Sequence, residues 1–161
     1  MNIPFFNYPA VYHKYKNDFQ RVLDEVGGRG AFIMQDDLLE FEKKIAKYSN
    51  CNFAVGVANA TDALEMLIEA SGIKKDDEVI ISTHTMIATA SAISANGAVP
   101  VPVECGNDHL IDPNSIIQSI NSKTKCIMPT QLNGRTANMD EICKIADDNG
   151  LLIIEDSAQA L

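Results

Sequence analysis

The residue best suited to chemistry follows the last apolar run of the sequence. Leu151–Glu155 is apolar enough to form a buried strand, and Asp156 comes directly after it. In open α/β sheets ligands sit beyond the carboxyl ends of the strands. A carboxylate there could bind Mg²⁺, hold a ribose or pair with a cationic ring nitrogen, and it could also simply cap a helix. Position alone leaves these uses open.

A second candidate is a turn of small residues that runs straight into a helical pattern. It contains Asn59, Ala60 and Thr61, and Asp62 follows. Backbone N–H groups at a helix start lack partners and lie at the positive end of the helix dipole, so such a turn suits a phosphate group. N-capping by Asn59, Thr61 or Asp62 accounts for the same residues without a ligand.

Two further polar loops follow predicted strands, at 83–86 and 129–134. By themselves they are ordinary loops. No Gly-x-Gly-x-x-Gly follows a strand and no G-x-x-x-x-G-K-[ST] occurs, so the dinucleotide-binding and P-loop motifs are absent.

The elements that must position these residues alternate between strand and helix. Short runs that are apolar on both faces, separated by helices, predict an α/β fold with a parallel sheet covered on both sides. The predicted strands are Phe53–Val57, Val79–Ser82, Val99–Val103, Lys125–Met128 and Leu151–Glu155. The predicted helices are 16–26, one capped by Asp36 or Asp37, Asp62–Ser71, Met86–Asn96, one opened by Asp112-Pro113, and Asp140–Asn149.

Two prolines in Val99–Val103 cannot donate to a strand ladder, which predicts that this strand lies at an edge of the sheet.

Composition excludes several classes of function. The chain of 161 residues is 46% hydrophobic and 22% charged, as in soluble globular proteins, and its net charge of −9 argues against nucleic-acid binding. No apolar run is long enough to span a membrane and the first residues do not resemble a signal peptide, so we expect a cytoplasmic protein. The four cysteines are widely spaced, which predicts free thiols and no metal site. They are Cys51, Cys105, Cys126 and Cys143.

Several motifs, taken in order, resemble one known family. They are Asn-Ala-Thr-Asp-Ala-Leu at 59–64, Asp-Glu-Val-Ile-Ile at 77–81, Gly-Ala-Val-Pro-Val at 97–101 and Ile-Ile-Glu-Asp-Ser-Ala-Gln-Ala at 153–160. Together they resemble the DegT/StrS-type sugar-nucleotide aminotransferases, which are fold-type I enzymes that use pyridoxal 5′-phosphate (PLP). The resemblance runs from about residue 3 to the end of the chain.

The resemblance implies a role for five residues at a PLP site. Ala60 and Thr61 would hold the cofactor phosphate, and Asp156 would pair with the protonated pyridine nitrogen. Gln159 would touch the ring hydroxyl. Met86 stands where the family usually places an aromatic residue that stacks on the ring.

The sequence also departs from the family pattern. Asn59-Ala60-Thr61 replaces the usual Ser-Gly-Thr, and 131–134 reads Gln-Leu-Asn-Gly where the family has His-Leu-Tyr-Gly. The family's Schiff-base lysine is expected beyond Leu161, so we expect no catalytic residue in this chain.

The resemblance further implies an incomplete three-layer, parallel-sheet large domain of fold type I. Residues 1–161 would be its N-terminal part, with a helical segment at 1–50 and βα repeats at 51–161, and the small C-terminal domain would be absent. The family's sheet has seven strands, so the strand predicted at 53–57 would lack a neighbour here.

The function implied is transfer of an amino group from an amino acid, glutamate in our expectation, to a nucleotide-linked keto-sugar. The products would serve surface glycans, including lipopolysaccharide and other polysaccharides, or glycosylated metabolites, and the enzyme would be a homodimer. Three alternatives stay open: a PLP-dependent sugar dehydratase with histidine in place of the lysine, a non-catalytic binding module with the PLP fold, and an unrelated parallel α/β binding domain.

Overall fold

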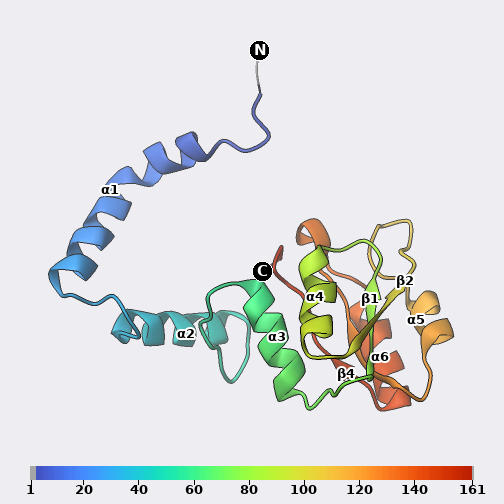
Figure 1. The fold of residues 1–161 in the computed structure, drawn as a ribbon. Helices are drawn as coiled ribbons and strands as arrows, with labels where there is room; N and C mark the ends of the chain where they lie inside the picture. Colours follow the sequence, from blue (N-terminus) through green and yellow to red (C-terminus); the bar gives the residue numbers. More distant parts are fainter. Residues whose placement is uncertain (1–2, 161) are drawn as a thin grey trace. The chain divides into compact units, whose positions relative to one another are not determined.

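The computed structural model describes residues 3–160, which fall into two compact units divided between Gly56 and Val57. The first unit contains helices α1 (Tyr8–Gly28) and α2 (Asp36–Tyr48). The second contains a four-stranded sheet and the remaining helices (Figure 1).

Both helices of the first unit differ in their starts from the sequence prediction. α1 begins eight residues before the predicted 16–26 because Asn7 caps it, with its side-chain oxygen accepting from the Ala10 amide at 3.2 Å. The predicted cap of α2 is wrong. Gln35 occupies the cap position without a side-chain hydrogen bond, and Asp36 and Asp37 lie in the first turn, where their charge favours the helix dipole.

The strand predicted at Phe53–Val57 does not form. A strand needs a neighbour for its N–H and C=O groups, and within residues 3–160 no strand pairs with this segment. The Gly56 amide instead donates to Glu42 Oε1 at 2.7 Å. The side chains of Phe53 and Val55 are exposed, at 86% and 80%. The prediction of a strand at Phe53–Val57 is therefore wrong, because the segment lacks the neighbour that a strand requires.

The sheet of the second unit is entirely parallel, as predicted, in the order β2-β1-β3-β4. Its strands are β1 (Glu78–Ser82), β2 (Val99–Val103), β3 (Thr124–Met128) and β4 (Leu152–Ile153). The proline-containing β2 lies at an edge, which confirms the prediction. β4 is shorter than the predicted Leu151–Glu155, although a parallel bridge between Thr130 and Asp156 extends the pairing with β3 beyond it.

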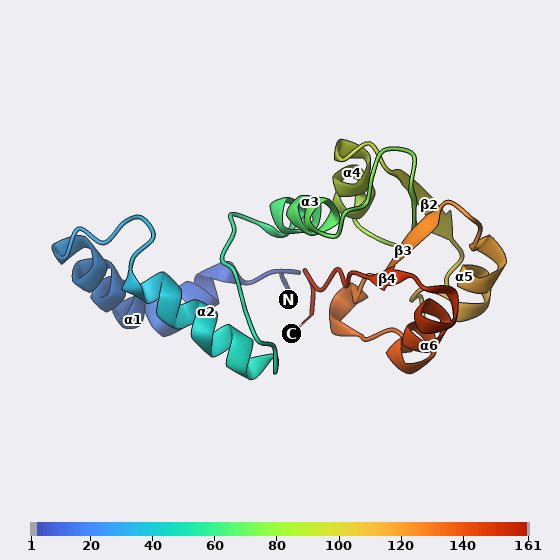
Figure 2. The ribbon, with the colours of Figure 1, turned by 90° about the horizontal axis from the view of Figure 1, so that it is seen from below.

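Two pairs of helices cover opposite faces of the sheet (Figures 1 and 2). α3 (Ala60–Ala70) and α4 (Ile87–Ala95) pack on one face, and α5 (Pro113–Ser119) and α6 (Met139–Asn149) pack on the other. A single 3₁₀ turn, η1, spans Leu132–Gly134. The predicted cap of α5 is confirmed, since Asp112 accepts from the amides of Asn114 and Ser115.

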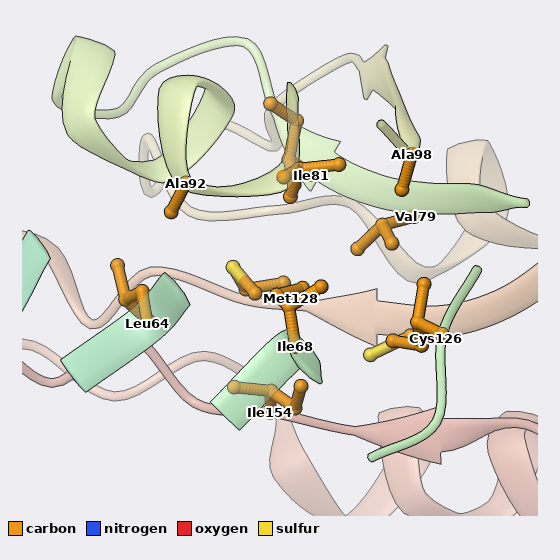
Figure 3. Packing of buried hydrophobic residues seen from close by; sticks show 11 residues of the cluster. Leu64, Ile68, Val79, Ile81, Ala92, Ala98, Cys126, Met128 and Ile154 are labelled. Carbon is orange, nitrogen blue, oxygen red and sulfur yellow. The ribbon is translucent and has the colours of Figure 1, made fainter. Parts of the chain in front are cut away.

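Alternation along the strands divides the core into two clusters. Val79 and Ile81 of β1 point towards α3 and α4 (Figure 3), whereas Ile80 belongs to the cluster under α5 and α6. The neighbouring β3 behaves in the same way, with Met128 in the first cluster and Ile127 in the second. A short strand that is apolar on both faces can be stable only in such a layered arrangement.

Removing a central side chain should destabilise the second unit. Ile127 is fully buried in β3, and Ile127→Ala is expected to lower the free energy of unfolding by about 2–5 kcal/mol through lost burial and a residual cavity. Urea unfolding followed by circular dichroism measures this change. Ile117→Ala on α5, where the side chain is 54% exposed, is the matched control and should change stability by less than about 0.5 kcal/mol. Equal effects of the two substitutions would contradict the assignment of the core.

The buried thiol of Cys126 gives a prediction about reactivity and pH. Burial raises the pKa of Cys126 to about 12, because the thiolate is poorly solvated in the core. This pKa lies above that of the unfolded thiol, about 8.5. The contribution of the neutral buried thiol to stability is therefore complete below about pH 8.5 and is lost as pH rises towards 12.

In a chain with Cys51, Cys105 and Cys143 replaced by serine, Cys126 should react with a thiol reagent at pH 8 only after unfolding. Exposed Cys143, left as the single cysteine, is the control and should react in the folded chain. Fast labelling of folded Cys126 would contradict its burial.

Candidate functional site

Asp156 lies at the carboxyl edge of the sheet, where backbone pairing holds it rigidly. Its amide donates to the Pro129 carbonyl at 3.0 Å, and its own carbonyl accepts from the Gln131 amide at 2.9 Å. The residue is 4% exposed. The structure thus places this carboxylate after the last strand, as the sequence predicted, but buries it almost completely.

The Asp156 carboxylate is held by two hydrogen-bond donors. Oδ2 accepts from the Thr89 hydroxyl at 2.6 Å, and Oδ1 accepts from the Ala158 amide at 3.3 Å. Within residues 3–160, no lysine, arginine or histidine forms an ion pair with it. A buried charge without a counter-charge is costly. The Asp156 carboxylate is therefore well suited to pair with a cationic ligand.

Three threonines form a hydroxyl chain behind Asp156. Thr89 Oγ1 lies 2.7 Å from Thr85 Oγ1, which lies 2.8 Å from Thr130 Oγ1. Thr89 and Thr130 are buried and Thr85 is half-buried. These hydroxyls join the start of α4 to Thr130, which follows Pro129. Through Thr89 they also join α4 to Asp156 in the segment after β4.

The first turn of α3 lies beside Asp156, because Ala60 and Asp156 line the same pocket. The Asn59 side chain accepts from the Asp62 amide at 3.0 Å, so Asn59 is the helix cap, one of the possibilities that the sequence left open. The amides of Ala60 and Thr61 donate no hydrogen bond within the described part of the chain. Two backbone donors at the positive end of this helix are thus left for a ligand.

A concave pocket of about 260 Å³ joins these two features. Its lining residues are Ala60, Ala63, Leu64, Leu67, Glu155, Asp156, Ser157 and Ala158. Ala60 and Asp156, which are 96 positions apart, therefore face one space. Thr61 is half-buried in the same helical turn without lining the pocket.

Gln159 is oriented by the turn that follows β3. Its side-chain Oε1 accepts from the Asn133 amide at 2.8 Å. Because that oxygen is engaged, the Nε2 group is the side-chain donor left for a ligand. Asn133 adopts φ 57°, a left-handed conformation that asparagine tolerates better than most residues, and this conformation presents its amide to Gln159.

Gln131 braces the same turn from inside. The side chain is buried, and its Nε2 donates to Glu155 Oε2 at 2.6 Å while its Oε1 accepts from the Ala137 amide at 2.8 Å. Both ends of this side-chain amide are therefore satisfied, by the Glu155 side chain and by the Ala137 backbone. Since the backbone amide of Gln131 also donates to the Asp156 carbonyl, Gln131 supports the segment that carries Asp156.

Met86 precedes α4, and its carbonyl accepts from the amide of Thr89, the residue that bonds to Asp156. Met86 is 59% exposed and lines an apolar hollow of about 410 Å³ with Thr85, Ile87 and Pro100 among its neighbours. The structure thus brings Ala60 and Asp156 to one pocket. Thr61 and Gln159 each follow a residue that lines this pocket, and Met86 lines the hollow to which Thr85 contributes.

Sequence reasoning missed the residues that hold Asp156 in place. Thr85 lies in the loop at 83–86, which is polar but carries no motif, and Thr89 lies inside the predicted helix Met86–Asn96. Thr130 and Asn133 lie in a loop that was noted only as polar. No local pattern could have shown that these residues meet Asp156 and Gln159.

Residues 3–160 contain no group of three or more histidine, cysteine, aspartate or glutamate side chains placed to hold a metal ion. None of the helices in the same range is both long and apolar enough to cross a membrane.

Comparison with known proteins identifies the family. The sequence model of the DegT/DnrJ/EryC1/StrS aminotransferase family matches residues 13–161. The chain belongs to this family. It is 41% identical over 159 residues to dTDP-3-amino-3,6-dideoxy-alpha-D-galactopyranose transaminase of Aneurinibacillus thermoaerophilus, covering 98% of this chain and 44% of that protein.

Solved structures of this aminotransferase family have the same fold. DesV of S. venezuelae superimposes with a TM-score of 0.95 at 37% identity, over 98% of this chain and 43% of that one. NtdA of Bacillus subtilis, with bound cofactor PMP, also gives 0.95, at 31% identity over 99% of this chain and 37% of that one. The chain therefore spans less than half the length of these relatives, and its parallel sheet is an incomplete fold-type I domain.

Proposed function

We propose that this chain forms the cofactor-binding part of a PLP-dependent aminotransferase that acts on a nucleotide-linked keto-sugar, with an amino acid, glutamate, as the donor. The products would enter surface-glycan or glycosylated-metabolite synthesis, and the intact enzyme would be a cytoplasmic homodimer. The Schiff-base lysine of that enzyme would lie outside the residues of this chain.

The observation that carries the proposal is the Asp156 carboxylate, which is buried and has no cationic partner among the described residues. A protonated pyridine nitrogen is a cation that could pair with the Asp156 carboxylate, which lines a pocket. A charge-assisted hydrogen bond of this kind contributes about 1.5–3 kcal/mol. The residues present therefore fit the ring of PLP.

The first turn of α3 fits the other end of the cofactor. The free amides of Ala60 and Thr61 point from the positive end of an eleven-residue helix, and the Thr61 hydroxyl has no partner within the described residues. Asp62 adds a negative charge in the same turn, but its Oδ2 already accepts from Asn59 Nδ2 at 3.0 Å. A dianionic phosphate would thus meet donors that nothing else in residues 3–160 uses.

PLP supplies an electron sink for the carbanion that forms at the substrate carbon when an amino group is transferred. In this chain, Asp156 would hold the proton on the ring nitrogen. Gln159 would offer its Nε2 group to the ring hydroxyl, because the Asn133 amide occupies its Oε1. Burial of Asp156 excludes water, which would weaken the pairing with the ring.

The substrate class rests on the relatives. The A. thermoaerophilus protein is named for transamination of a dTDP-linked amino sugar. The chain matches that protein across the whole sheet and the Asp156 edge, which are the parts that would hold the cofactor. We extend the nucleotide-linked keto-sugar to this chain on that basis.

Binding of pyridoxamine 5′-phosphate tests the proposed cofactor site, since this form needs no lysine to bind. Asp156→Asn should weaken its binding about 10- to 150-fold, which corresponds to the loss of one charge-assisted hydrogen bond. Isothermal titration calorimetry measures the affinity. The control is Asp148→Asn, at an exposed position of α6. It makes the same change of charge and should leave the affinity unchanged. Equal affinity of the wild-type chain and Asp156→Asn would rule out the assigned role of Asp156.

A further inference from the structure

We propose that the hydroxyls of Thr130, Thr85 and Thr89 form a one-way hydrogen-bond relay that aims the Asp156 carboxylate at the ring nitrogen of the cofactor. Thr89 and Thr85 are then positioning residues for the reaction. The inference rests on the proposed function, because it assigns these residues a role towards that same cofactor.

The direction of the relay follows from counting protons. The oxygens of an ionised carboxylate only accept, so Thr89 must spend its single hydroxyl proton on Asp156 Oδ2. The 2.7 Å contact with Thr85 therefore requires Thr85 to donate to Thr89. Thr85 then has no proton left, and the 2.8 Å contact with Thr130 requires Thr130 to donate to Thr85. Every hydroxyl points towards Asp156.

The Thr89 hydroxyl bonds outside its own helix. Thr89 lies in the first turn of α4, so the residue four positions earlier, Thr85, precedes the helix. Here the hydroxyl leaves the helix and crosses 67 positions of sequence to reach Asp156. The β-branch limits the rotamers of Thr89, so its full burial locks the direction of the O–H group.

The relay leaves acceptor capacity on Asp156 for one more donor. A carboxylate offers about four lone-pair sites, and the described residues fill two of them, through Thr89 and Ala158. With both oxygens tethered, the carboxylate cannot rotate freely, and it lines the pocket beside Ala60. The remaining lone pairs therefore have a fixed direction, which lowers the cost of ordering when a cationic N–H arrives.

Mutual polarisation makes the order of the threonines matter. Hydrogen bonds in a chain strengthen one another, by about 10–30% per bond in condensed-phase estimates. Loss of Thr89 removes the bond to the carboxylate itself, loss of Thr85 removes only its polarising donor, and loss of Thr130 acts one step further away. The expected effects on Asp156 therefore fall in the order Thr89, Thr85, Thr130.

The test uses pyridoxamine 5′-phosphate labelled with ¹⁵N in the ring. Thr89→Val keeps the shape but removes the hydroxyl. It should weaken binding by less than the lower limit of about tenfold expected for Asp156→Asn, because the Thr89–Asp156 bond is present before the probe binds and only its change in strength on binding is lost. The ring ¹⁵N shift of the saturated complex should also move towards that of the neutral ring. Thr89→Ser restores the hydroxyl and should restore both readouts. Thr136→Val, at an exposed threonine, is the control and should change neither.

The ¹⁵N readout separates positioning from a merely structural role. A structural role would lower stability in Thr89→Val but leave the ring shift of the saturated complex unchanged, and that result would overturn the inference. If Thr89→Val does not fold, Thr85→Val decides, because it leaves the Thr89–Asp156 bond in place and should still move the ring shift in the same direction. An unmoved shift there also overturns the inference. Failure of the wild-type chain to bind the probe would instead overturn the cofactor proposal, and the inference with it.

Discussion

The candidate site depends on one constraint, the burial of the Asp156 carboxylate at the carboxyl edge of the sheet without a cation beside it among the described residues. An isolated buried charge costs several kcal/mol, so the fold must offset it with hydrogen bonds. It does so with a threonine hydroxyl and a backbone amide. These two donors satisfy part of the carboxylate and leave the remainder for a ligand.

The layered α/β architecture is what makes this arrangement possible. Parallel strands bring the segments that follow β1, β3 and β4 to one edge, so that Thr85, Thr130 and Asp156 meet although they are far apart in sequence. α3 and α4 cover the same face of the sheet, and their starts bring Ala60 and Thr89 to that edge. The hydrophobic core thus sets the geometry of the site, although the polar groups of the site are not part of the core.

Two residues of the loop after β3 support the site through hydrogen bonds. Gln131 satisfies both ends of its side-chain amide with Glu155 and the Ala137 backbone, and its backbone amide donates to the Asp156 carbonyl. Asn133 adopts the left-handed conformation that directs its backbone amide to Gln159. Both residues thus hold the segments that carry Asp156 and Gln159.

The sequence alone determined the parallel α/β class, the edge position of the proline-containing strand, and the place of Asp156 directly after the last strand. These features depend on local properties: apolar runs, turn residues, and the missing N–H of proline.

Tertiary structure decided the rest. Residues 53–57 have a strand-like pattern, but a strand requires a neighbour, and that depends on what lies beside it. The threonine relay is invisible in sequence because its partners are joined only by the stacking of α4 on the sheet. Asp156 was predicted from its position after a strand, whereas its burial and the direction of its donors followed from packing alone.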